Sequence, residues 1–408
     1  MFEWNEPFKL IMQIKHDYVS KFELDTLDFN TWLEKLNNIR YNNIFESLQT
    51  NQFNEFLLIR YGLADMQEGM WTNPNSIYRE CRSLVIDLKK EQIVLTPFRK
   101  FFNVNEVEEN SLDNIRKEIS YANSIEITNK LDGSMQSARL YNNHIFLAGS
   151  MALDKEHSFR LKDGYTKLTN NHISMIKENP EYTFIFEYIS LKDAHVVLYN
   201  KEQEGLYLLK LRNVYTGKQL SYKDTKKFAN KYNVPMTKIE NRTFSEILQL
   251  TKKYKSSEKE GWVLDIDGHM IKLKCDDYVK LHKLLDKLSS VNVIIQNIAD
   301  DKYDDMMAKI PELYKDRVNK IANIIINYKN EINQKINKYY KVAPKENKKD
   351  FMIWVDNNCS KDINAFVKCI YLNKSFNVLK KAHGRSYKKL KDLGLYENYA
   401  ALFADLEE

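Results

Sequence analysis

The chain has 408 residues, of which 62 are basic and 56 acidic, so its formal net charge is only +6, and 43% of its residues are hydrophobic. This composition is typical of a soluble globular protein and excludes a disordered chain, a membrane protein and a collagen-like repeat. The four cysteines and eight histidines have the spacing of neither a disulfide scaffold nor a zinc site. We expect a cytoplasmic protein, located in the host cytoplasm if its source is viral, with no membrane-spanning segment.

Up to about residue 285, short apolar or alternating runs separated by turn residues predict an antiparallel sheet with interspersed helices. Asn142-Asn143 and Asp267-Gly268 each separate two such runs and predict tight hairpin turns, since Asn, Asp and Gly tolerate the left-handed region. The predicted strands cover residues 123–128, 137–141, 144–147, 182–189, 206–211, 261–266 and 269–274, and helices are predicted around residues 170–178 and 221–231.

After residue 285 the apolar period becomes that of a helix. Apolar residues recur at steps of three or four from Tyr314 through Ile325 to Tyr339, and Pro311 suits the first turn. This pattern predicts one long amphipathic helix that ends before Pro344 and buries its isoleucine stripe in a core. Further helices are predicted over residues 351–355, 363–372 and 387–403. The chain is therefore predicted to be α+β over residues 1–285 and all-helical over residues 286–408.

One short motif indicates covalent chemistry on a phosphate. Lys130-x-Asp132-Gly133 follows a predicted strand and is the nucleophile motif of covalent nucleotidyltransferases, in which the lysine amine attacks the α-phosphate of a nucleotide. The attack requires an unprotonated amine, so we expect nearby cations or burial to lower the pKa of Lys130. Gly133 would let the backbone approach the phosphates closely. Taken alone, the motif is also compatible with a surface turn.

Three further charged positions support the first interpretation. Glu187 lies within an apolar predicted strand, where a buried carboxylate is costly. Lys272 and Lys274 are two residues apart on a strand and point to one face, where an anion such as phosphate would offset their repulsion. Strict alternation across the hairpin places Glu260 on the opposite face, so the site needs either a bend at Gly261 or Glu260 at the very start of the strand.

The order of these motifs resembles that of the RNA ligase 1 family of the T-even bacteriophage type, within the superfamily of ATP-dependent polynucleotide ligases and mRNA capping enzymes. Segments 80–82, 100–106 and 272–282 resemble further signatures of that family, and the likeness covers about residues 75–285. Met135 stands where DNA ligases and capping enzymes usually carry an arginine, and helices replace the barrel that follows in those enzymes. The resemblance therefore favours RNA over DNA ligation and over capping.

The resemblance implies an antiparallel-sheet nucleotidyltransferase domain of the ATP-grasp-like ligase class over residues 1–285, which uses ATP and Mg²⁺, followed by a helical domain over residues 286–408 that selects RNA. It also implies roles for eight residues: Lys130 as the adenylylated nucleophile, Arg82 and Lys100 on the phosphates of ATP, Glu187 on the ribose or on the water ligands of the metal, Glu260 on magnesium and on Lys130, Lys272 and Lys274 on the α-phosphate, and Arg212 near the nucleoside.

Some positions depart from the family or have two interpretations. Ala148 stands where the family carries a basic residue before Gly-Ser, so a phosphate contact is missing or is replaced, with Lys155 as one candidate. Arg212 is equally compatible with a solvated surface arginine. Asp304 and Asp305 would form a metal-binding pair or, more in keeping with their position, a solvated acidic helix end. The basic residues between 380 and 391 would bind RNA or form a solvated helix face.

These features together predict an ATP-dependent RNA ligase that joins 5′-phosphate and 3′-hydroxyl ends through lysyl-AMP and RNA-adenylate intermediates, in the repair of RNA or tRNA. Two alternatives remain at this point. The first is a DNA ligase or another polynucleotide adenylyltransferase, and the second is a catalytically silent RNA-binding protein on a ligase fold. We expect a monomer whose partner is RNA rather than a membrane.

Overall fold

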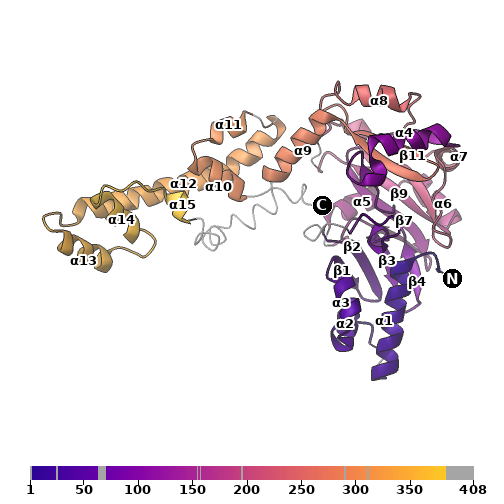
Figure 1. Cartoon of the computed structure of the whole chain (residues 1–408), viewed down its shortest axis with the longest axis horizontal. Coiled ribbons are helices and arrows are strands. Elements are labelled where there is room, and N and C mark those ends of the chain that lie inside the picture. The colour runs from indigo at the N-terminus through magenta and orange to yellow at the C-terminus, as the bar shows by residue number, and fades with distance from the viewer. Residues whose placement is uncertain are drawn as a thin grey trace. The chain divides into compact units, whose positions relative to one another are not determined.

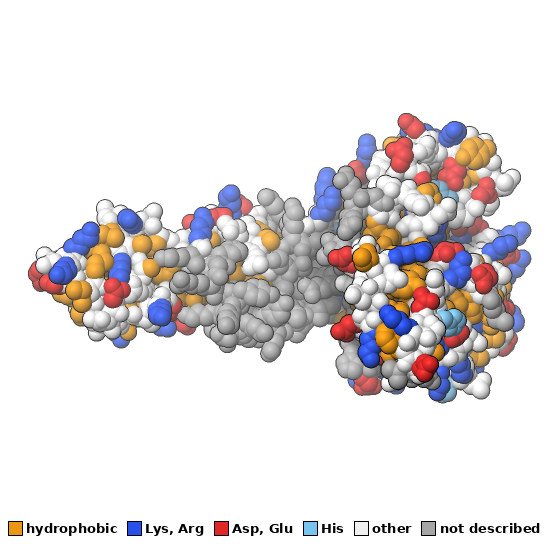
Figure 2. Space-filling view, turned by 60° about the horizontal axis from the view of Figure 1, so that its bottom comes forward, with side chains coloured by type: hydrophobic (Ala, Val, Ile, Leu, Met, Phe, Trp, Pro, Cys, Tyr) orange, Lys and Arg blue, Asp and Glu red, His pale blue; other side chains and the backbone are white. Residues whose placement is uncertain are grey.

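A computed structural model describes residues 2–23, 26–62, 70–153, 155–156, 158–193, 196–288, 291–308, 310 and 312–382 (Figure 1). The chain divides after Val279 into two compact units. On the face shown in Figure 2, basic and acidic side chains are interspersed over the described residues, as the small net charge predicts. No helix among these residues is long and apolar enough to cross a membrane.

The first unit begins with three helices packed on a four-stranded antiparallel sheet of order β1-β2-β3-β4 (Figure 1). The side chain of Asn5 accepts a hydrogen bond from the Phe8 amide and so caps the first helix. Phe8, Ile11 and Trp32 pack on Leu57 and other residues of one face of the sheet. None of these elements is among those predicted from the sequence. They are α1 Glu6–Phe22, α2 Phe29–Leu36, α3 Ile39–Phe45, β1 Leu48–Phe53, β2 Phe56–Tyr61, β3 Arg82–Asp87 and β4 Gln92–Leu95, with a 3-10 turn at Ile77–Glu80.

Two further four-stranded sheets have the orders β10-β9-β7-β8 and β5-β12-β11-β6, and the pairing between β12 and β5 is parallel. Their strands are β5 Phe102–Asn103, β6 Ile125–Lys130, β7 Ser134–Tyr141, β8 His144–Ala148, β9 Tyr182–Ile189, β10 Gly205–Asn213, β11 Gly261–Ile266 and β12 His269–Lys274. The helices of this region are α4 Leu112–Tyr121, α5 Phe159–Lys167, α6 Asn170–Glu178, α7 Tyr222–Tyr232 and α8 Phe244–Leu250, with 3-10 turns at Glu108–Asn110 and Lys201–Gln203.

Both predicted hairpins are confirmed. Asn142 and Asn143 connect β7 to β8 with φ angles of 49° and 63°, and Asp267 and Gly268 connect β11 to β12 with φ angles of 48° and 97°. These residues form the turns because they enter the left-handed region at low cost. The three residues between β6 and β7 connect one sheet to the other. Lys130, the last residue of β6, directly precedes this link.

In the described part of the second unit, every regular element is a helix. The long predicted helix is α12, and Ile321, Ile325, Ile332 and Ile336 of its apolar stripe are buried, so the prediction of a core face is confirmed. Pro311, the Tyr314 side chain and the helix predicted over residues 387–403 lie outside the described residues. The helices are α9 Asp276–Leu288, which spans the division, α10 Val291–Ala299, α11 Tyr303–Met307, α12 Glu312–Val342, α13 Lys348–Asn358, α14 Asn364–Tyr371 and α15 Val378–Ala382.

Two adjacent isoleucines of α12 provide a test of this burial pattern. Ile325 is fully buried, whereas Ile324 is 36% exposed on the same helix. We expect Ile325→Ala to lower the free energy of unfolding by about 2–5 kcal/mol, because it removes buried methyl groups and leaves a cavity. Ile324→Ala is the matched control and should cost much less. Urea denaturation followed by circular dichroism measures both, and equal losses would contradict the described face of α12.

Candidate active site

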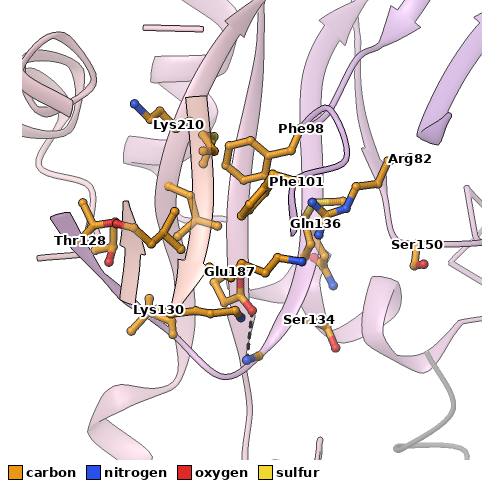
Figure 3. A pocket seen from close by; sticks show the side chains of 18 of the residues that line it. Arg82, Phe98, Phe101, Thr128, Lys130, Ser134, Gln136, Ser150, Glu187 and Lys210 are labelled. Carbon is orange, nitrogen blue, oxygen red and sulfur yellow. Dashed lines mark hydrogen bonds between the residues drawn. The ribbon is translucent and has the colours of Figure 1, made fainter. Parts of the chain in front are cut away.

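A cavity of about 340 Å³ lies between the sheets of the first unit (Figure 3). Its lining includes five of the eight residues singled out from the sequence: Arg82, Lys130, Glu187, Lys272 and Lys274. The apolar part of the lining comes from Phe98, Phe101 and Met270, which pack together between the strands. Segments far apart in the sequence therefore bring cations and aromatic rings to one pocket, a combination suited to a ligand with both phosphates and a flat ring.

The carboxylate of Glu260 lies between two lysines beside this pocket. Gly261 pairs with Lys130 of β6 on one side and with Lys274 of β12 on the other. The Oε2 atom of Glu260 lies 2.6 Å from Lys130 Nζ, and Oε1 lies 3.0 Å from Lys274 Nζ. Glu260 itself is 3% exposed. The carboxylate therefore orients the proposed nucleophile directly.

The backbone at Gly261 explains why the carboxylate reaches the lysines. Gly261 has a φ of +153° and starts β11, so Glu260 precedes the strand and does not follow its alternation. A Cβ atom at this position would lie 2.1 Å from the carbonyl oxygen of Leu273. Of the two arrangements left open by the sequence, the structure combines both: Glu260 is at the strand's start and Gly261 supplies the bend.

The loop after Lys130 is fixed by Asp132 and Gly133. The Oδ2 atom of Asp132 accepts hydrogen bonds of 2.8 Å from the amides of Val196 and Val197, and Oδ1 accepts one of 2.7 Å from the Tyr278 hydroxyl. The Gly133 amide donates to Glu187 Oε1 at 3.0 Å (Figure 3). A Cβ atom at position 133 would lie 2.4 Å from the carbonyl oxygen of Tyr188, so the motif needs glycine for close packing on β9.

The protonation of Lys130 differs from the expectation. Burial acts to lower the pKa of Lys130, but the carboxylates of Glu260, Glu187 and Asp132 outweigh it and leave this pKa raised. The expected lowering of the pKa of Lys130 by burial or nearby cations is therefore wrong for the protein alone, because the three carboxylates stabilise the ammonium form by more than burial destabilises it. Burial and neighbouring cations, of which Arg82 is the foremost, instead hold the pKa of Lys272 well below its ordinary value.

Arg82 and Lys272 lie against the same aromatic ring at one side of the pocket. The Arg82 guanidinium is 5.2 Å and Lys272 Nζ 4.7 Å from the centre of the Phe101 ring. The Nη1 atom of Arg82 is buried and has no hydrogen-bond partner among the described residues. A buried donor without an acceptor, beside a second cation, fits an anionic ligand such as a phosphate.

Lys100 belongs to a neighbouring cavity and not to the lining of this pocket. Its Nζ atom donates to the Tyr61 hydroxyl at 3.3 Å and lies within 5.6 Å of the ring centres of Tyr61, Trp71 and Phe102. It nevertheless contributes to the positive potential that acts on Lys272.

At the other end of the pocket is a buried ion cluster that the sequence analysis did not identify. Lys210 Nζ lies 2.6 Å from Asp265 Oδ2 and 3.3 Å from Glu126 Oε2, and all three residues line the cavity. Figure 3 shows Lys210 and Thr128 opposite Arg82. The sequence pattern could have identified Lys210, because this charged residue interrupts an apolar strand as Glu187 does. Its partners lie on other strands, where no spacing rule points to them.

Arg212 does not line the pocket, and its assignment to nucleoside binding is corrected. It is buried, and its guanidinium donates to the carbonyl oxygens of Pro97 at 2.8 Å and Gly217 at 2.9 Å and pairs with Glu80 at 2.9 Å. These bonds make it a structural residue that links β10 to the segments beside β3 and β4. The alternative of a solvated surface arginine is equally wrong.

The remaining candidates also lie away from the pocket. Lys155 is exposed and lines a separate surface hollow with Tyr165. Asp304 and Asp305 are exposed in the first turn of α11, as expected for an acidic helix start. Of the basic residues between 380 and 391, Lys380 pairs with Asp300 at 2.5 Å, and the other basic side chains lie outside the described residues.

The residues of the pocket could hold a magnesium ion only together with the phosphate oxygens of a nucleotide. Among the described residues no group of three or more His, Cys, Asp or Glu side chains is arranged to hold a metal. Magnesium beside nucleotides is held by one or two carboxylates together with phosphate oxygens and water, and so needs no such group. Glu187 lines the cavity, and Glu260 lies beside it with its two oxygens on Lys130 and Lys274.

Two glycines of the same hairpin provide a test of the bend at Gly261. Gly268→Ala should cost about 1–2 kcal/mol, because its φ of +97° is strained for a residue with a Cβ atom although the surrounding space is open. We expect Gly261→Ala to lower the melting temperature much further, because the added atom also collides with the Leu273 carbonyl group. Differential scanning calorimetry measures both variants. Similar melting temperatures would contradict the described backbone.

The raised pKa of Lys130 can be tested by removing one carboxylate. In Glu260→Gln the pKa of Lys130 should fall, so the neutral amine should appear at lower pH. Acetylation of Lys130, followed by mass spectrometry across a pH series, should show its midpoint shifted to lower pH. Glu258→Gln, an exposed neighbour, is the control. If the midpoint stays in place or rises in Glu260→Gln, Glu260 does not hold the proton on Lys130.

The stretch of chain that forms most of this pocket is similar to known RNA ligases. The model of a family described as RNA ligase matches residues 80–279. A putative bifunctional polynucleotide kinase/RNA ligase of Autographa californica nuclear polyhedrosis virus is 24% identical over 264 residues, which cover 57% of this chain and 35% of that protein. The chain thus spans about a third of the length of this relative.

Solved structures give weaker likenesses. A mutant RNA ligase of Naegleria gruberi with ATP and Mn is 18% identical, with a TM-score of 0.35, over 41% of this chain and 55% of that one. An archaeal ATP-dependent RNA ligase is 11% identical, with a TM-score of 0.43, over 78% and 85% of the two chains. The family match contains Arg82, Lys130, Glu187, Glu260 and the strand that carries Lys272 and Lys274, so over residues 80–279 this chain is similar to the RNA ligase family.

Proposed function

We propose that this protein is an ATP-dependent RNA ligase that joins a 5′-phosphate to a 3′-hydroxyl end. The observation that carries the proposal is the Lys130 ammonium held by Glu260 in a pocket of cations, within the residues matched by the RNA ligase family. The pocket combines a nucleophilic amine, an aromatic ring and buried guanidinium and ammonium groups, which is the set that attack on a nucleotide phosphate requires.

In the proposed first step, Lys130 Nζ attacks the α-phosphorus of ATP. Lys130 gives up one ammonium proton to solvent before the attack and a second as the nitrogen–phosphorus bond forms, and the bond to the pyrophosphate oxygen breaks. Lys272 and Lys274 would stabilise the charge that develops on the α-phosphate oxygens. Arg82, whose Nη1 atom has no hydrogen-bond partner among the described residues, would bind a phosphate of the departing pyrophosphate.

The amine must lose its proton before it can attack, and Glu260 holds that proton in place. Magnesium, held by Glu187 and Glu260 with the nucleotide phosphates, would supply positive charge that neutralises the phosphoryl oxygens and competes for the Glu260 carboxylate. Once the metal ion shares the Glu260 carboxylate, the ammonium form of Lys130 loses part of its stabilisation. Burial and the lysines at positions 272 and 274 would then lower the pKa of Lys130.

In the later steps AMP passes from Lys130 to an RNA 5′-phosphate, and a 3′-hydroxyl then displaces AMP to seal the strand. We propose RNA or tRNA breaks as the substrate class and the helical second unit as the part that selects RNA. The proposed selection of RNA by this unit rests on the basic residues between 380 and 391 and on the lack of a catalytic motif in its sequence.

Self-labelling with α-labelled ATP and magnesium tests the first step. Wild-type protein should retain label on a denaturing gel, and Lys130→Ala should retain none. Lys272→Ala and Lys274→Ala should each slow labelling by about 10²-fold or more, because they remove charge stabilisation. Lys252→Ala, an exposed lysine in the same unit, is the control.

Joining of nicked RNA and nicked DNA by the same preparation then tests the substrate. Sealing of RNA and not of DNA supports the proposal. Sealing of DNA alone would make the protein a DNA ligase. If the folded wild-type protein retains no label, the proposal is wrong, and a catalytically silent RNA-binding protein is the remaining alternative.

A further inference from the structure

A second cavity, of about 630 Å³, adjoins the pocket of Lys130. Phe101 and Met270 line both cavities, so the two meet at these side chains. The rest of the described lining comes from helix α4 and the 3-10 turn before it, from the segment between β4 and β5, and from the turn between β11 and β12. The reaction steps proposed above give no role to the cations of this second cavity.

Cations outnumber carboxylates in the described lining of the second cavity. The two carboxylates are both engaged, since Glu109 pairs with Arg79 at 2.6 Å and Glu118 Oε2 lies 2.8 Å from His269 Nδ1. The excess of positive charge is therefore what an incoming ligand meets, and it favours an anion. Besides Arg79, the cations of the lining are Arg99, Lys100 and Lys117.

Arg99 shows how closely the positive charges are placed. Its Nε atom lies 3.4 Å from Glu80 Oε1, but the same carboxylate pairs with Arg212 at 2.9 Å, so one carboxylate serves two guanidinium groups. Burial lowers the pKa of Arg99, and the cations of Arg79 and Arg212 lower it further against the opposing effect of Glu80. The Arg99 side chain is 38% exposed, so a ligand in the cavity can reach it.

Helix α4 adds an aromatic ring beside a cation. Tyr121, the last residue of α4, lines the cavity and is 67% exposed, and the exposed Lys117 lines it one turn earlier. Positions four apart lie on the same face of a helix, so the ring and the ammonium group belong to one surface. Single-stranded nucleic acids bind to such surfaces, because their bases stack on the ring while their phosphates meet the cations.

We propose that this second cavity binds a single-stranded segment of the RNA substrate, with Arg99 and Lys117 on its phosphates and the Tyr121 ring stacked on a base. The inference rests on the proposed function, which supplies RNA as the substrate, and deepens it by naming where the strand lies. Because the two cavities meet at Phe101 and Met270, a strand held here has a path to the pocket of Lys130.

Fluorescence anisotropy with a labelled single-stranded RNA that bears a 5′-hydroxyl tests the inference without turnover. The full-length variants are Lys117→Gln, Tyr121→Ala and Tyr121→Phe. Arg116→Gln is the matched control, because Arg116 is the exposed neighbour of Lys117 on α4 but does not line the cavity. Thermal melts establish first that each variant is folded, as we expect for substitutions at exposed helix positions.

The two kinds of contact predict different results. Lys117→Gln should reduce the slope of log affinity against log salt concentration by about 0.7, because one phosphate contact of a single strand is lost. Tyr121→Ala should weaken binding roughly 5- to 100-fold with the slope unchanged, because it removes base stacking. Tyr121→Phe retains the ring and should bind as the wild-type protein does, and Arg116→Gln should leave both quantities nearly unchanged.

Tripolyphosphate is the second probe, since it carries the phosphate chemistry of ATP without a base or a strand. If Lys117→Gln weakens the binding of tripolyphosphate as much as that of RNA, the cavity belongs to the nucleotide, and the inference is wrong. It is also wrong if the wild-type protein binds no RNA, or if Lys117→Gln and Tyr121→Ala bind RNA within twofold of the Arg116→Gln control.

Self-labelling of the wild-type protein separates this inference from the proposed function. If labelled enzyme forms while the variants bind RNA like the control, the inference fails and the proposed first step stands. If no labelled enzyme forms, the proposed function fails, and weaker RNA binding by Lys117→Gln and Tyr121→Ala would still identify the second cavity as an RNA site.

Discussion

The geometry of the pocket depends on one buried carboxylate, that of Glu260, which is held between the ammonium groups of Lys130 and Lys274. Burying a carboxylate without partners is costly, and two cations with direct hydrogen bonds offset that cost. The three residues come from the ends of β6 and β12 and from the position just before β11. Their contact therefore also fixes where these strand ends lie relative to each other, and removal of any one partner leaves a buried charge behind.

The same contact creates a chemical problem that the proposed reaction has to solve. The carboxylates keep Lys130 protonated, whereas attack on phosphorus requires the neutral amine. On the other side of the pocket, burial and the neighbouring cations, Arg82 first among them, lower the pKa of Lys272. A nucleotide with its metal ion would bring negative charge to these cations and positive charge to Glu260. Ligand binding would thus redistribute the charge that holds the proton on Lys130, which couples activation of the nucleophile to occupancy of the site.

The N-terminal sheet shows why a family match does not account for the whole pocket. The match begins at residue 80, yet Arg60 and Tyr61 of β2 contribute to the lining. They reach it because β2 pairs with β3, which carries Arg82, and because the bulge at Ser83 sets the register of the two arginines. The hydrogen bonds from Arg60 and Ser83 to Ser150 connect this sheet to the strand β8 that precedes the Gly149-Ser150 segment.

The sequence by itself determined the features that depend on near neighbours: the Asn142-Asn143 and Asp267-Gly268 turns, the core stripe of α12 and the motif around Lys130. Turn conformations and helix faces follow from a few adjacent residues, so local spacing suffices to predict them. Only the tertiary structure decided the direction of the Glu260 side chain, because it depends on the backbone conformation at Gly261 and on where β11 begins. The protonation of Lys130, the burial of Arg212 and the position of Arg60 were likewise undetermined, since each is a sum of contacts between strands that are distant in the chain and whose pairing no local pattern specifies.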